Sequence, residues 1–464
     1  MVTSRHPRVY GNHARTKVTR LTAPRHSLGF SINNRMRNLV CMSLVAILTF
    51  FSTIFSITWI DFSTTISNNS VHVIYGSSSK KSSEPIDPNA GKPITFLLLG
   101  QDTREGKNNN FAHDGETDNH QSDTAMVVQI SADRSYVNIV SIPRDSMVNA
   151  PECDTSRGGR IPAREHVMFN SIFAYGYAQG GDLSSAASCS LKTVNSLTGL
   201  DIDNFIVADF NGLSEMINAI GGVDLCIPVT THDVYTGVTL KRGMRHLNGV
   251  TATQYARMRH DSASDGSDIM RTTRQQYLIK QLVHQALSKN LLTQSGQLYQ
   301  LAKSALSSLN ISSGLAHYET LVGLAMSLHK LDTSHIYART IPIVADPSNP
   351  NRVVWDASAQ DVWETMRENR PLTNKRHNAP SHPKSSDDAQ SDSTQNNSSN
   401  HKSEYGPVNP KTGLAKDSSG RLIDPNTGGI VNPEDGTIRD PNTGYYMGIA
   451  DKYINNTICA VPKS

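Results

Sequence analysis

The feature that most constrains this chain is an uncharged, apolar stretch near its N-terminus, running from Leu39 to Ile60. As a helix rising about 1.5 Å per residue, it is long enough to cross the roughly 30 Å of hydrocarbon in a bilayer. Cleaved signal peptides usually have a shorter apolar core and a cleavage site of small residues, whereas this stretch ends beside Trp59, a residue typical of membrane interfaces. We therefore predict an uncleaved transmembrane helix over residues 39–60.

The charges that precede this stretch predict its orientation. Residues 1–38 contain Arg and Lys at intervals but no Asp or Glu, although the whole chain of 464 residues has a formal net charge of only +3. By the positive-inside rule such an arm stays in the cytoplasm, so the chain after Asp61 lies outside the cell. A basic arm can also bind nucleic acid or anionic lipid. Since an apolar stretch follows directly, we interpret the charge as a topology signal and predict a single-pass cell-membrane protein without a nucleic-acid partner.

Composition divides the remainder of the chain into folded and unfolded parts. Residues 61–92 are rich in Ser, Asn and Lys, which is typical of a flexible linker. Residues 371–404 almost lack large apolar side chains, so burial cannot offset the entropy of folding and we predict disorder. Between these segments we place a main domain at 93–290 and a C-terminal extension of that domain at 291–370.

Apolar periodicity within residues 93–370 predicts the fold class. Apolar runs bounded by turn residues predict strands, and apolar residues at spacings of three and four predict helices. Because the two kinds of element alternate, the class is α/β. The strands are expected at 94–99, 125–130, 136–142, 223–227, 336–343 and 353–355, and the clearest helices at 212–220 and 274–292.

Residues 405–464 carry a repeat in which an Asx-Pro pair is followed by a Gly. Asx, Pro and Gly at these offsets favour reverse turns, so each copy should form one turn between very short extended segments. The repeat suits either an appendage that contacts wall carbohydrate or a solvated tail, and we class it as a low-complexity C-terminal tail. Its copies are residues 409–413, 424–428, 432–436 and 440–444.

Four of the five cysteines lie in the part of the chain that we place outside the membrane. They are Cys153, Cys189, Cys226 and Cys459, whereas Cys41 lies in the apolar stretch. An even set in an oxidising compartment commonly forms disulfides, but four cysteines allow three pairings and their spacing does not choose among them. Buried thiols are the alternative. No CxxC or CxxH spacing predicts a zinc site.

Two carboxylates flank the first two predicted strands. Asp102 follows the strand at 94–99 together with Arg104, and Asp123 precedes the strand at 125–130. Two carboxylates presented by adjacent strand ends can hold Mg²⁺ while leaving positions for phosphate oxygens and water. An Asp in a loop after a strand, taken alone, is more often a turn or capping residue.

Arginines form a second candidate cluster. Guanidinium groups stay charged and present a fork of donors that matches phosphate, which suits a pyrophosphate ligand. Arg257 and Arg259, two residues apart, point the same way in an extended chain. The alternative is a solvated basic face with structural salt bridges. The cluster comprises Arg144, Arg257, Arg259, Asp268, Arg271, Arg274 and Gln275, with Arg271 and Gln275 on one face of a helix that begins near Asp268.

Taken together and in order, seven sequence motifs resemble the LytR-CpsA-Psr family. They are LLLGQDTR, SDTAMV, SIPRD, FNSIFAYG, IGGVDLCIP, LNGVTATQYARMRH and DIMRTTRQQ, and they lie between Ile94 and Leu287. The basic and apolar N-terminal region is similar to the family's layout. The cysteines at Cys153, Cys189 and Cys226 resemble those of actinobacterial members, which suggests a Gram-positive source.

The resemblance implies a fold and a reaction. The fold is a three-layer α/β/α sandwich with a mixed central sheet, in which an apolar pocket takes up a polyprenyl chain. The reaction moves a phosphate-linked glycopolymer from a polyprenyl pyrophosphate carrier to a peptidoglycan hydroxyl and releases polyprenyl phosphate. Such phosphoryl transfer depends mainly on positioning and charge neutralisation.

The resemblance also implies roles for individual residues. Asp102 and Asp123 would be Mg²⁺ ligands or close partners of the ligands. The general base that deprotonates the acceptor is open between Asp145 and Asp268. Arg144, Arg257, Arg259 and Arg271 would grip the pyrophosphate, Asp268 and Gln275 would support them, and Arg104 and Arg274 are further candidate pyrophosphate contacts.

The chain departs from the family's pattern in two places. Where many members carry a lysine before the Asn of FNSIFAYG, this chain has Met168 and Phe169, so Arg164 is the candidate replacement. The segment between the two carboxylates is long and rich in Asn and His, and its side chains either add metal ligands or line a loop. The candidates there are His113, Asp118 and His120.

Two other functions remain open at this point. One is a non-catalytic surface protein that binds or senses lipid-linked glycan, with the repeat as a wall-binding part. The other is a polyprenyl pyrophosphate hydrolase, in which water replaces the peptidoglycan acceptor. Binding an anion does not require paired acids, so the carboxylates favour an Mg²⁺-dependent transferase over a binding protein.

Overall fold

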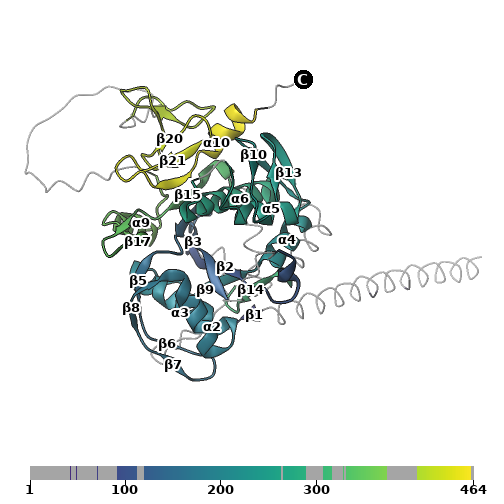
Figure 1. Ribbon diagram of the computed structural model, residues 1–464, viewed down its shortest axis with the longest axis vertical. Coiled ribbons are helices and arrows are strands. Elements are labelled where there is room, and N and C mark those ends of the chain that lie inside the picture. Colours follow the sequence, from purple (N-terminus) through teal and green to yellow (C-terminus); the bar gives the residue numbers. More distant parts are fainter. Residues whose placement is uncertain are drawn as a thin grey trace, which may run out of the picture. The chain divides into compact units, whose positions relative to one another are not determined.

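The computed structural model describes residues 42, 49, 70–71, 91–111, 120–262, 265–288, 307–315, 328, 331–373 and 405–460 (Figure 1). The chain divides into two units, Met1–Phe62 and Ser63–Ser464, and the sheets and helices that position the site belong to the second unit. Apart from residues 42 and 49, the predicted transmembrane helix lies outside the described residues, as do most of the predicted linker and residues 374–404. Within the described ranges, no helix is both long and apolar enough to span a bilayer.

A seven-stranded mixed sheet forms the core of the second unit (Figure 1). Its strands are β1 (Ser70–Val71), β2 (Ile94–Asp102), β3 (Gln121–Ile130), β4 (Val137–Ile142), β9 (Asn204–Ala208), β14 (Leu309–Ser312) and β15 (Ile336–Thr340). They are ordered β1-β14-β9-β2-β3-β4-β15. Strand β3 runs antiparallel to β2 and β4, whereas β9 is parallel to β2 and β15 is parallel to β4. The prediction of an α/β fold with a mixed central sheet is confirmed.

The pairing of β2 with β3 contains a bulge. Gly100 pairs with Thr124, and the next pair is Gln101 with Ser122, which leaves Asp123 as an extra residue on β3. A bulge bends its strand and redirects a side chain. Glycine is required at position 100, because a Cβ there would lie 2.8 Å from the Cβ of Thr124.

Helices α2 (Phe169–Gly180) and α3 (Leu183–Thr198) cover one face of the sheet. Leu97 and Leu99 of β2 share a buried core with Phe173 of α2 and Val194 of α3. Leu97 and Leu99 are two residues apart, and alternate residues of a strand point to the same face of the sheet. Helix α9 (Ala359–Arg367) adds Trp363 to the same core.

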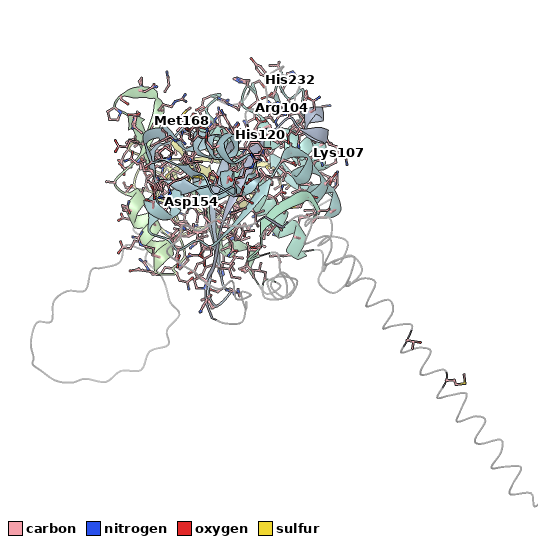
Figure 2. The ribbon with its side chains drawn as sticks, turned by 90° about the horizontal axis from the view of Figure 1, so that it is seen from below. Arg104, Lys107, His120, Asp154, Met168 and His232 are labelled. Atoms are coloured by element: carbon pink, nitrogen blue, oxygen red, sulfur yellow. A yellow bond between two sulfur atoms is a disulfide. The ribbon has the colours of Figure 1, made fainter. Side chains whose placement is uncertain are left out.

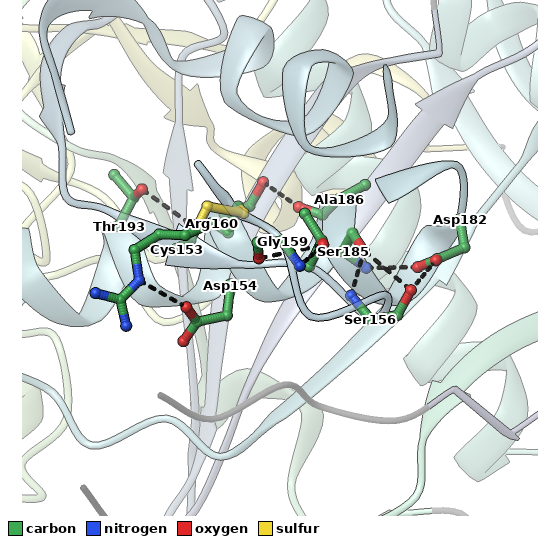
Figure 3. The surroundings of a disulfide bond; sticks show 12 residues. Cys153, Asp154, Ser156, Gly159, Arg160, Asp182, Ser185, Ala186 and Thr193 are labelled. Carbon is green, nitrogen blue, oxygen red and sulfur yellow. Dashed lines mark hydrogen bonds and ion pairs between the residues drawn. A yellow bond between two sulfur atoms is a disulfide. The ribbon is translucent and has the colours of Figure 1, made fainter. Parts of the chain in front are cut away.

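A disulfide between Cys153 and Cys189 ties α3 to the hairpin of β6 (Cys153–Asp154) and β7 (Arg160–Ile161), as Figure 3 shows. Next to it, Asp182 caps α3 by accepting a hydrogen bond from the backbone N–H of Ser185 at 2.8 Å. The other carboxylate oxygen of Asp182 accepts from the hydroxyl of Ser156. The start of α3 is thereby fixed to the hairpin by a covalent bond and by hydrogen bonds.

Helix α6 (Asp268–Ser288) lies against the opposite face. Gln276 Nε2 donates to Ser141 Oγ at 2.9 Å and to Thr340 Oγ1 at 3.0 Å. Ser141 alternates along β4 with Val140 and Ile142, which belong to the α2 and α3 core, so its side chain points to the other side of the sheet. Helices therefore cover both faces.

A second core surrounds α6. Helices α4 (Phe210–Ala219) and α5 (Gly249–Arg257) and the hairpin of β10 (Val223–Ile227) and β13 (Gly243–Leu247) contribute to it. From α6 it takes Leu278 and Leu282. Shorter elements complete this unit: β5 (Met147–Ala150) pairs with β8 (Arg164–Met168), β11 (Thr231–His232) with β12 (Thr239–Leu240) and β16 (Ile343–Asp346) with β17 (Asn349–Trp355), and the 3-10 helices are Gly106–Phe111 and Thr333–His335.

Residues 405–460, which we call the repeat module, form a folded sheet. The strands β18 (Ala415–Lys416), β19 (Leu422–Ile423), β20 (Ile430–Val431), β21 (Thr437–Arg439) and β22 (Tyr446–Ile449) pair in chain order and are followed by α10 (Asp451–Tyr453) and a π-helix at Ile454–Ile458. Ile438 and Met447 of this module share the second core with Leu278 of α6. The prediction of a solvated, low-complexity tail is therefore wrong for these residues, because their few apolar side chains are buried against α6.

Each copy of the repeat does form one turn. The backbone carbonyl of its Asx residue accepts a hydrogen bond from the N–H of the Gly four residues later, at 2.8 or 2.9 Å. The φ angles of these glycines lie between 72° and 75°, a region that residues with a Cβ rarely adopt. The last three turns join β19 to β20, β20 to β21 and β21 to β22, whereas the first precedes β18. Those three copies of the repeat are therefore hairpin turns. The four bonds run from Gly413 to Asn409, Gly428 to Asp424, Gly436 to Asn432 and Gly444 to Asp440.

Candidate active site

Asp123, the bulged residue of β3, lies between two arginines from different elements. Arg144 Nη1, just after β4, is 2.9 and 3.0 Å from the two carboxylate oxygens. Arg271 Nη1, from the first turn of α6, is 3.1 Å from Oδ2. Burial opposes ionisation of this carboxyl, but Arg271 and Arg144 outweigh it and lower the pKa of Asp123 to about 2. Asp123 is therefore ionised at neutral pH.

Asp268, the first residue of α6, completes this cluster. Its Oδ1 is 3.0 Å from Arg144 Nε and 2.5 Å from Arg271 Nη2. These are ion pairs without the angles of hydrogen bonds. Burial raises the pKa of Asp268, against the opposing effect of Arg271 and Arg144. Two guanidinium groups are thus shared between two carboxylates of opposite pKa shift.

Arg259 belongs to the same group of charges. Burial lowers its pKa, and repulsion from Arg144 and Arg271 adds to that effect. Its backbone N–H and that of His260 donate to Asp233 Oδ2 at 3.0 and 2.9 Å. The sequence motifs did not single out Asp233, because on its own it has the pattern of an ordinary turn residue. It fixes the backbone that carries Arg259.

Arg257 and Arg259 do not share an extended segment, so the same-side arrangement that an extended chain would give them does not apply. Arg257 is the last residue of α5, so its direction is set by that helix. Its guanidinium lies 4.3 Å from the centroid of the Phe210 ring and donates to the carbonyl of Phe111. It also acts electrostatically on Asp102. Arg257 therefore belongs to the Asp102 side of the site.

Asp102 ends β2 and forms an ion pair with Arg104. Burial raises the pKa of Asp102, and the negative charge of Asp123 adds to the rise, whereas Arg104 and Arg257 oppose it. The structure therefore brings the two predicted carboxylates within electrostatic range of each other. Each of them also has an arginine partner.

Gln275 links the bulge of β3 to the helices. Its Oε1 accepts from Thr124 Oγ1 at 2.9 Å, and its Nε2 donates to the carbonyl of Ala256 at 3.2 Å. The sequence motifs did not single out Thr124, although its place beside Asp123 was a local signal. Gln275 thus positions the strand that carries Asp123.

Arg274 is the predicted site residue that the structure does not bring to the cluster. Its Nη2 lies 2.6 Å from Asp261 Oδ2, and its Nη1 donates to the carbonyl of Met258 at 3.1 Å. Asp261 also accepts from Thr231 Oγ1 at 2.7 Å. All these side chains are buried, so Arg274 braces the segment after α5.

Of the three additional metal-ligand candidates, His120 has a structural role, and His113 and Asp118 lie outside the described residues. His113 and Asp118 fall in residues 112–119, which the structure does not describe. The ring of His120 stacks on Tyr177 with 3.8 Å between centroids, and its Nδ1 lies 3.1 Å from Gln101 Nε2. Figure 2 marks His120 together with Arg104.

Arg164, the candidate replacement for the missing lysine, lies on β8. Its guanidinium sits 4.2 Å from the centroid of the Tyr175 ring. Burial lowers its pKa. Met168, also marked in Figure 2, ends the same strand and precedes α2 without a side-chain capping bond.

The carboxylates fit one mode of magnesium binding. In the described ranges no group of three or more His, Cys, Asp or Glu side chains is arranged to hold a metal ion. Mg²⁺ is, however, often held by one or two carboxylates together with phosphate oxygens of the substrate. Asp102 and Asp123, whose charges repel each other, fit that mode because a cation between them would relieve the repulsion.

Several similar proteins of known sequence are named for cell-wall biosynthesis or for teichoic acid transfer. The chain is 27% identical over 274 residues to the cell wall biosynthesis protein LcpA of Corynebacterium glutamicum, covering 56% of this chain and 52% of that protein. It is 25% identical over 305 residues to the polyisoprenyl-teichoic acid–peptidoglycan teichoic acid transferase TagV of Bacillus subtilis, covering 64% and 70%. The chain thus spans about half the length of LcpA, 52%, and 60% of the related LcpB.

Solved structures of similar proteins are more distant in sequence. B. subtilis TagV matches with a TM-score of 0.45 and 21% identity over 60% of this chain and 97% of that one. The LytR-Csp2A-Psr enzyme from Actinomyces oris matches with a TM-score of 0.44 and 18% identity over 64% and 94%. The sequence model of the LytR_cpsA_psr family matches residues 60–370, which is more than half of the chain. This chain belongs to the LytR-CpsA-Psr family.

Proposed function

We propose that this protein transfers a phosphate-linked glycopolymer from a polyprenyl pyrophosphate carrier to peptidoglycan at the outer face of the cell membrane. The observation that carries the proposal is the grip of Arg144 and Arg271 on Asp123, with Asp268 and Arg259 around them. The relative TagV, named as a polyisoprenyl-teichoic acid–peptidoglycan teichoic acid transferase, supports the same reaction class.

The charge balance of the cluster favours an anionic ligand. Three guanidinium groups, those of Arg144, Arg259 and Arg271, face the carboxylates of Asp123 and Asp268. A third carboxylate, that of Asp145, lies 3.8 Å from Arg144 Nε and is balanced by Arg352. The repulsion that lowers the pKa of Arg259 would be relieved by a bound anion. A pyrophosphate supplies several negative oxygens that match the donor forks of arginine.

In the proposed reaction, the acceptor hydroxyl attacks the phosphorus that bears the glycan. The bond between that phosphorus and the bridging oxygen breaks, and polyprenyl phosphate leaves with the electron pair. The arginines neutralise charge on the phosphoryl oxygens as the bonds change. The proton of the hydroxyl passes to a carboxylate.

Of the two candidate proton acceptors, Asp268 suits the role better than Asp145. Burial raises the pKa of Asp268, which makes its carboxylate a better proton acceptor than an ordinary aspartate. Asp145 is instead held by Arg352, whose Nη1 lies 2.7 Å from its Oδ1. Asp268 is ion-paired as well, with Arg144 and Arg271, so the choice between the two acids rests on the raised pKa of Asp268.

Asp102 and Asp123 would hold the magnesium ion. When bound there, Mg²⁺ would neutralise phosphate oxygens and help to orient them. Arg104 and Arg257 favour the ionised form of Asp102 that a metal requires. The proposed cofactor and the arginines therefore act on the same pyrophosphate.

The N-terminal region would keep this site near its lipid substrate. The apolar stretch at 39–60 anchors the chain, and the basic residues before it stay in the cytoplasm. The catalytic residues then face the exterior, where peptidoglycan is found.

The proposal is tested with the full-length protein in detergent micelles. It is incubated with a lipid-pyrophosphate glycan, peptidoglycan oligomers and Mg²⁺ or EDTA. Wild type is compared with Asp123→Ala and Arg257→Ala, and with the control Arg160→Ala, whose side chain is 58% exposed on β7. We expect labelled glycan on the oligomer for wild type and control, and loss of that product in both site variants and in EDTA.

Two results would contradict this proposal. Binding of the lipid substrate without any turnover would indicate a binding protein. Release of the glycan phosphate into water, with no transfer although the oligomer is present, would indicate a hydrolase.

A further inference from the structure

The repeat module is held rigidly on the catalytic domain. The disulfide Cys226–Cys459 joins β10 to the end of the module. Tyr277 Oη donates to Asn455 Oδ1 at 2.9 Å, and Lys280 Nζ lies 2.8 Å from Asp451 Oδ2. One covalent bond and polar contacts thus fix the module to α6 over the shared apolar core.

A cavity of about 530 Å³ lies where the module meets α6 and β15. From the domain it is lined by α6 around Lys280 to His284 and by β15 around Arg339. From the module it is lined by two of the repeat turns, around Gly413 and Asp424, and by residues 451–456. Its volume falls within the range of small-ligand sites, roughly 300–1,000 Å³.

Arg339 gives this cavity a positive group in need of a partner. It is half-buried, and its Nε is buried without a hydrogen-bond partner among the described residues. Asp424 and Asp440 act on it electrostatically but form no ion pair with it. Burial lowers its pKa, and Asp424 and Asp440 oppose that effect. A guanidinium N–H that is buried without a partner is costly, so an anionic ligand group would be stabilised there.

The other polar groups of the cavity suit a saccharide. The amides of Gln281 and Asn426 line it, and neither side chain is hydrogen-bonded in the described part of the chain. Sugar hydroxyls both donate and accept hydrogen bonds, and a side-chain amide can accept through its oxygen and donate through its nitrogen. Tyr337 also lines the cavity, and its aromatic ring is a group that can pack on a sugar.

This cavity is separate from the arginine cluster. Lys280 follows Arg271 by nine residues on α6, which corresponds to roughly 14 Å along the helix axis. Nine residues also make about two and a half turns, so the two side chains leave opposite sides of the helix. A ligand in the cavity would therefore have to be a chain-like molecule to reach the catalytic site as well.

We propose that the cavity between the repeat module and α6 binds an anionic saccharide, with a carboxylate or phosphate on Arg339 and hydroxyls on Gln281 and Asn426. The choice of polymer rests on the proposed transferase function. Peptidoglycan would present carboxylates, and the transferred glycopolymer would present phosphates. In either case the module holds one polymer while its reacting end lies at the arginine cluster.

The test is a binding titration of the full-length protein in detergent by calorimetry. One arm uses soluble peptidoglycan fragments, and the other uses lipid-free, phosphate-linked glycan oligomers. Arg339→Met removes the charge but keeps the bulk, and Gln281→Trp fills the cavity while Arg339 stays. The control is Arg421→Met, in the same module, whose side chain is 57% exposed and pairs with Asp417.

We expect one probe to bind about tenfold or more weakly to both cavity variants and normally to the control. The arm that responds identifies the polymer. Thermal unfolding shows whether Arg339→Met is folded. If it is not, the affinity of Gln281→Trp alone decides whether the cavity binds the probe. Equal affinities of both variants and wild type for both probes would overturn the inference, as would a wild type that binds neither.

A transfer assay on a short acceptor separates this inference from the proposed function. Binding that depends on Arg339 without any transfer by wild type supports the cavity and contradicts the transferase. Transfer by wild type without binding that depends on Arg339 supports the transferase and contradicts the cavity. Arg339→Met itself should transfer to the short acceptor at the wild-type rate, because Arg339 does not touch the arginine cluster.

Discussion

Arg144 Nη1 lies within 3.0 Å of both carboxylate oxygens of Asp123. The two residues are brought together by the pairing of β3 with β4, in which Ala125 lies opposite Ile142. The bulge then adds one residue to β3 and sets the direction of Asp123. The central contact of the site is therefore produced by strand register.

Replacing Arg144 by lysine should lower the transfer rate about a hundredfold. Lysine keeps the charge but lacks the fork that reaches Asp123 and Asp268 together. The rate is measured as labelled glycan on peptidoglycan oligomers. Arg160→Lys is the matched control and should be unaffected. A wild-type rate for Arg144→Lys would show that only the charge is needed.

The stabilising contribution of the ionised Asp123 should be lost in acid. The pKa of Asp123 is about 2 in the folded chain, against an ordinary value of 3.8. A lowered folded-state pKa adds stability that is present above the unfolded pKa and is lost as the pH falls toward about 2. The difference amounts to about 2 kcal/mol.

This acid effect is measured by urea unfolding of wild type and Asp123→Asn. Between about pH 5 and pH 2, the free energy of unfolding should fall by about 2 kcal/mol more in wild type than in the variant. Asp102 and Asp268 titrate in both chains, but the charge of Asp123 contributes to their raised pKa values, so their contributions are similar in the two chains and not identical. Parallel curves would mean that the arginines do not hold Asp123 ionised.

Gly100→Ala should disturb the site from within the sheet. The new Cβ would lie 2.8 Å from Thr124 Cβ, so Thr124 must shift and its bond to Gln275 must weaken. We expect a loss of about 1–3 kcal/mol in stability and a lower transfer rate. Thermal unfolding and the transfer assay measure these effects. Thr124→Ser keeps the hydroxyl and should behave nearly as wild type; unchanged stability in Gly100→Ala would remove the steric argument.

Opening the Cys226–Cys459 disulfide should loosen the repeat module. The double variant Cys226→Ala/Cys459→Ala should lose roughly 2–4 kcal/mol and become sensitive to protease within residues 405–460. Mass spectrometry of limited digests locates the cuts. The variant Cys153→Ala/Cys189→Ala should be destabilised without cuts in the module. Equal digestion patterns would show that the apolar core alone holds the module.

Local patterns predicted most of the elements near the site. The strand predicted at 223–227 is β10 with the same bounds, and the helix expected near Asp268 begins there. Apolar periodicity reflects which residues of an element face a core, and it does not depend on which other element packs against them. Asp102 and Asp123 were placed just outside two predicted strands, and the observed strands β2 and β3, which pair, extend to include them.

The errors concern features that depend on distant parts of the chain. The spacing of Arg257 and Arg259 puts them on one side only of an extended chain, but α5 continues through Arg257. Arg274 was predicted to contact pyrophosphate together with nearby residues of the same helix, but it forms an ion pair with Asp261. The repeat was taken for a solvated tail because its apolar residues are few, and their burial against α6 has no local signal.

The sequence by itself determined the α/β class, the family, the turn at each repeat and the residue types of the anion-binding cluster. These follow from local spacing, since hydrophobic periodicity, glycine positions and short motifs act within a few residues. Only the tertiary structure decided that Arg144 and Arg271 share Asp123, that Cys226 pairs with Cys459, and that the module encloses a cavity with α6. Such contacts join residues far apart in the chain, and their geometry is set by strand register and by the packing of whole elements.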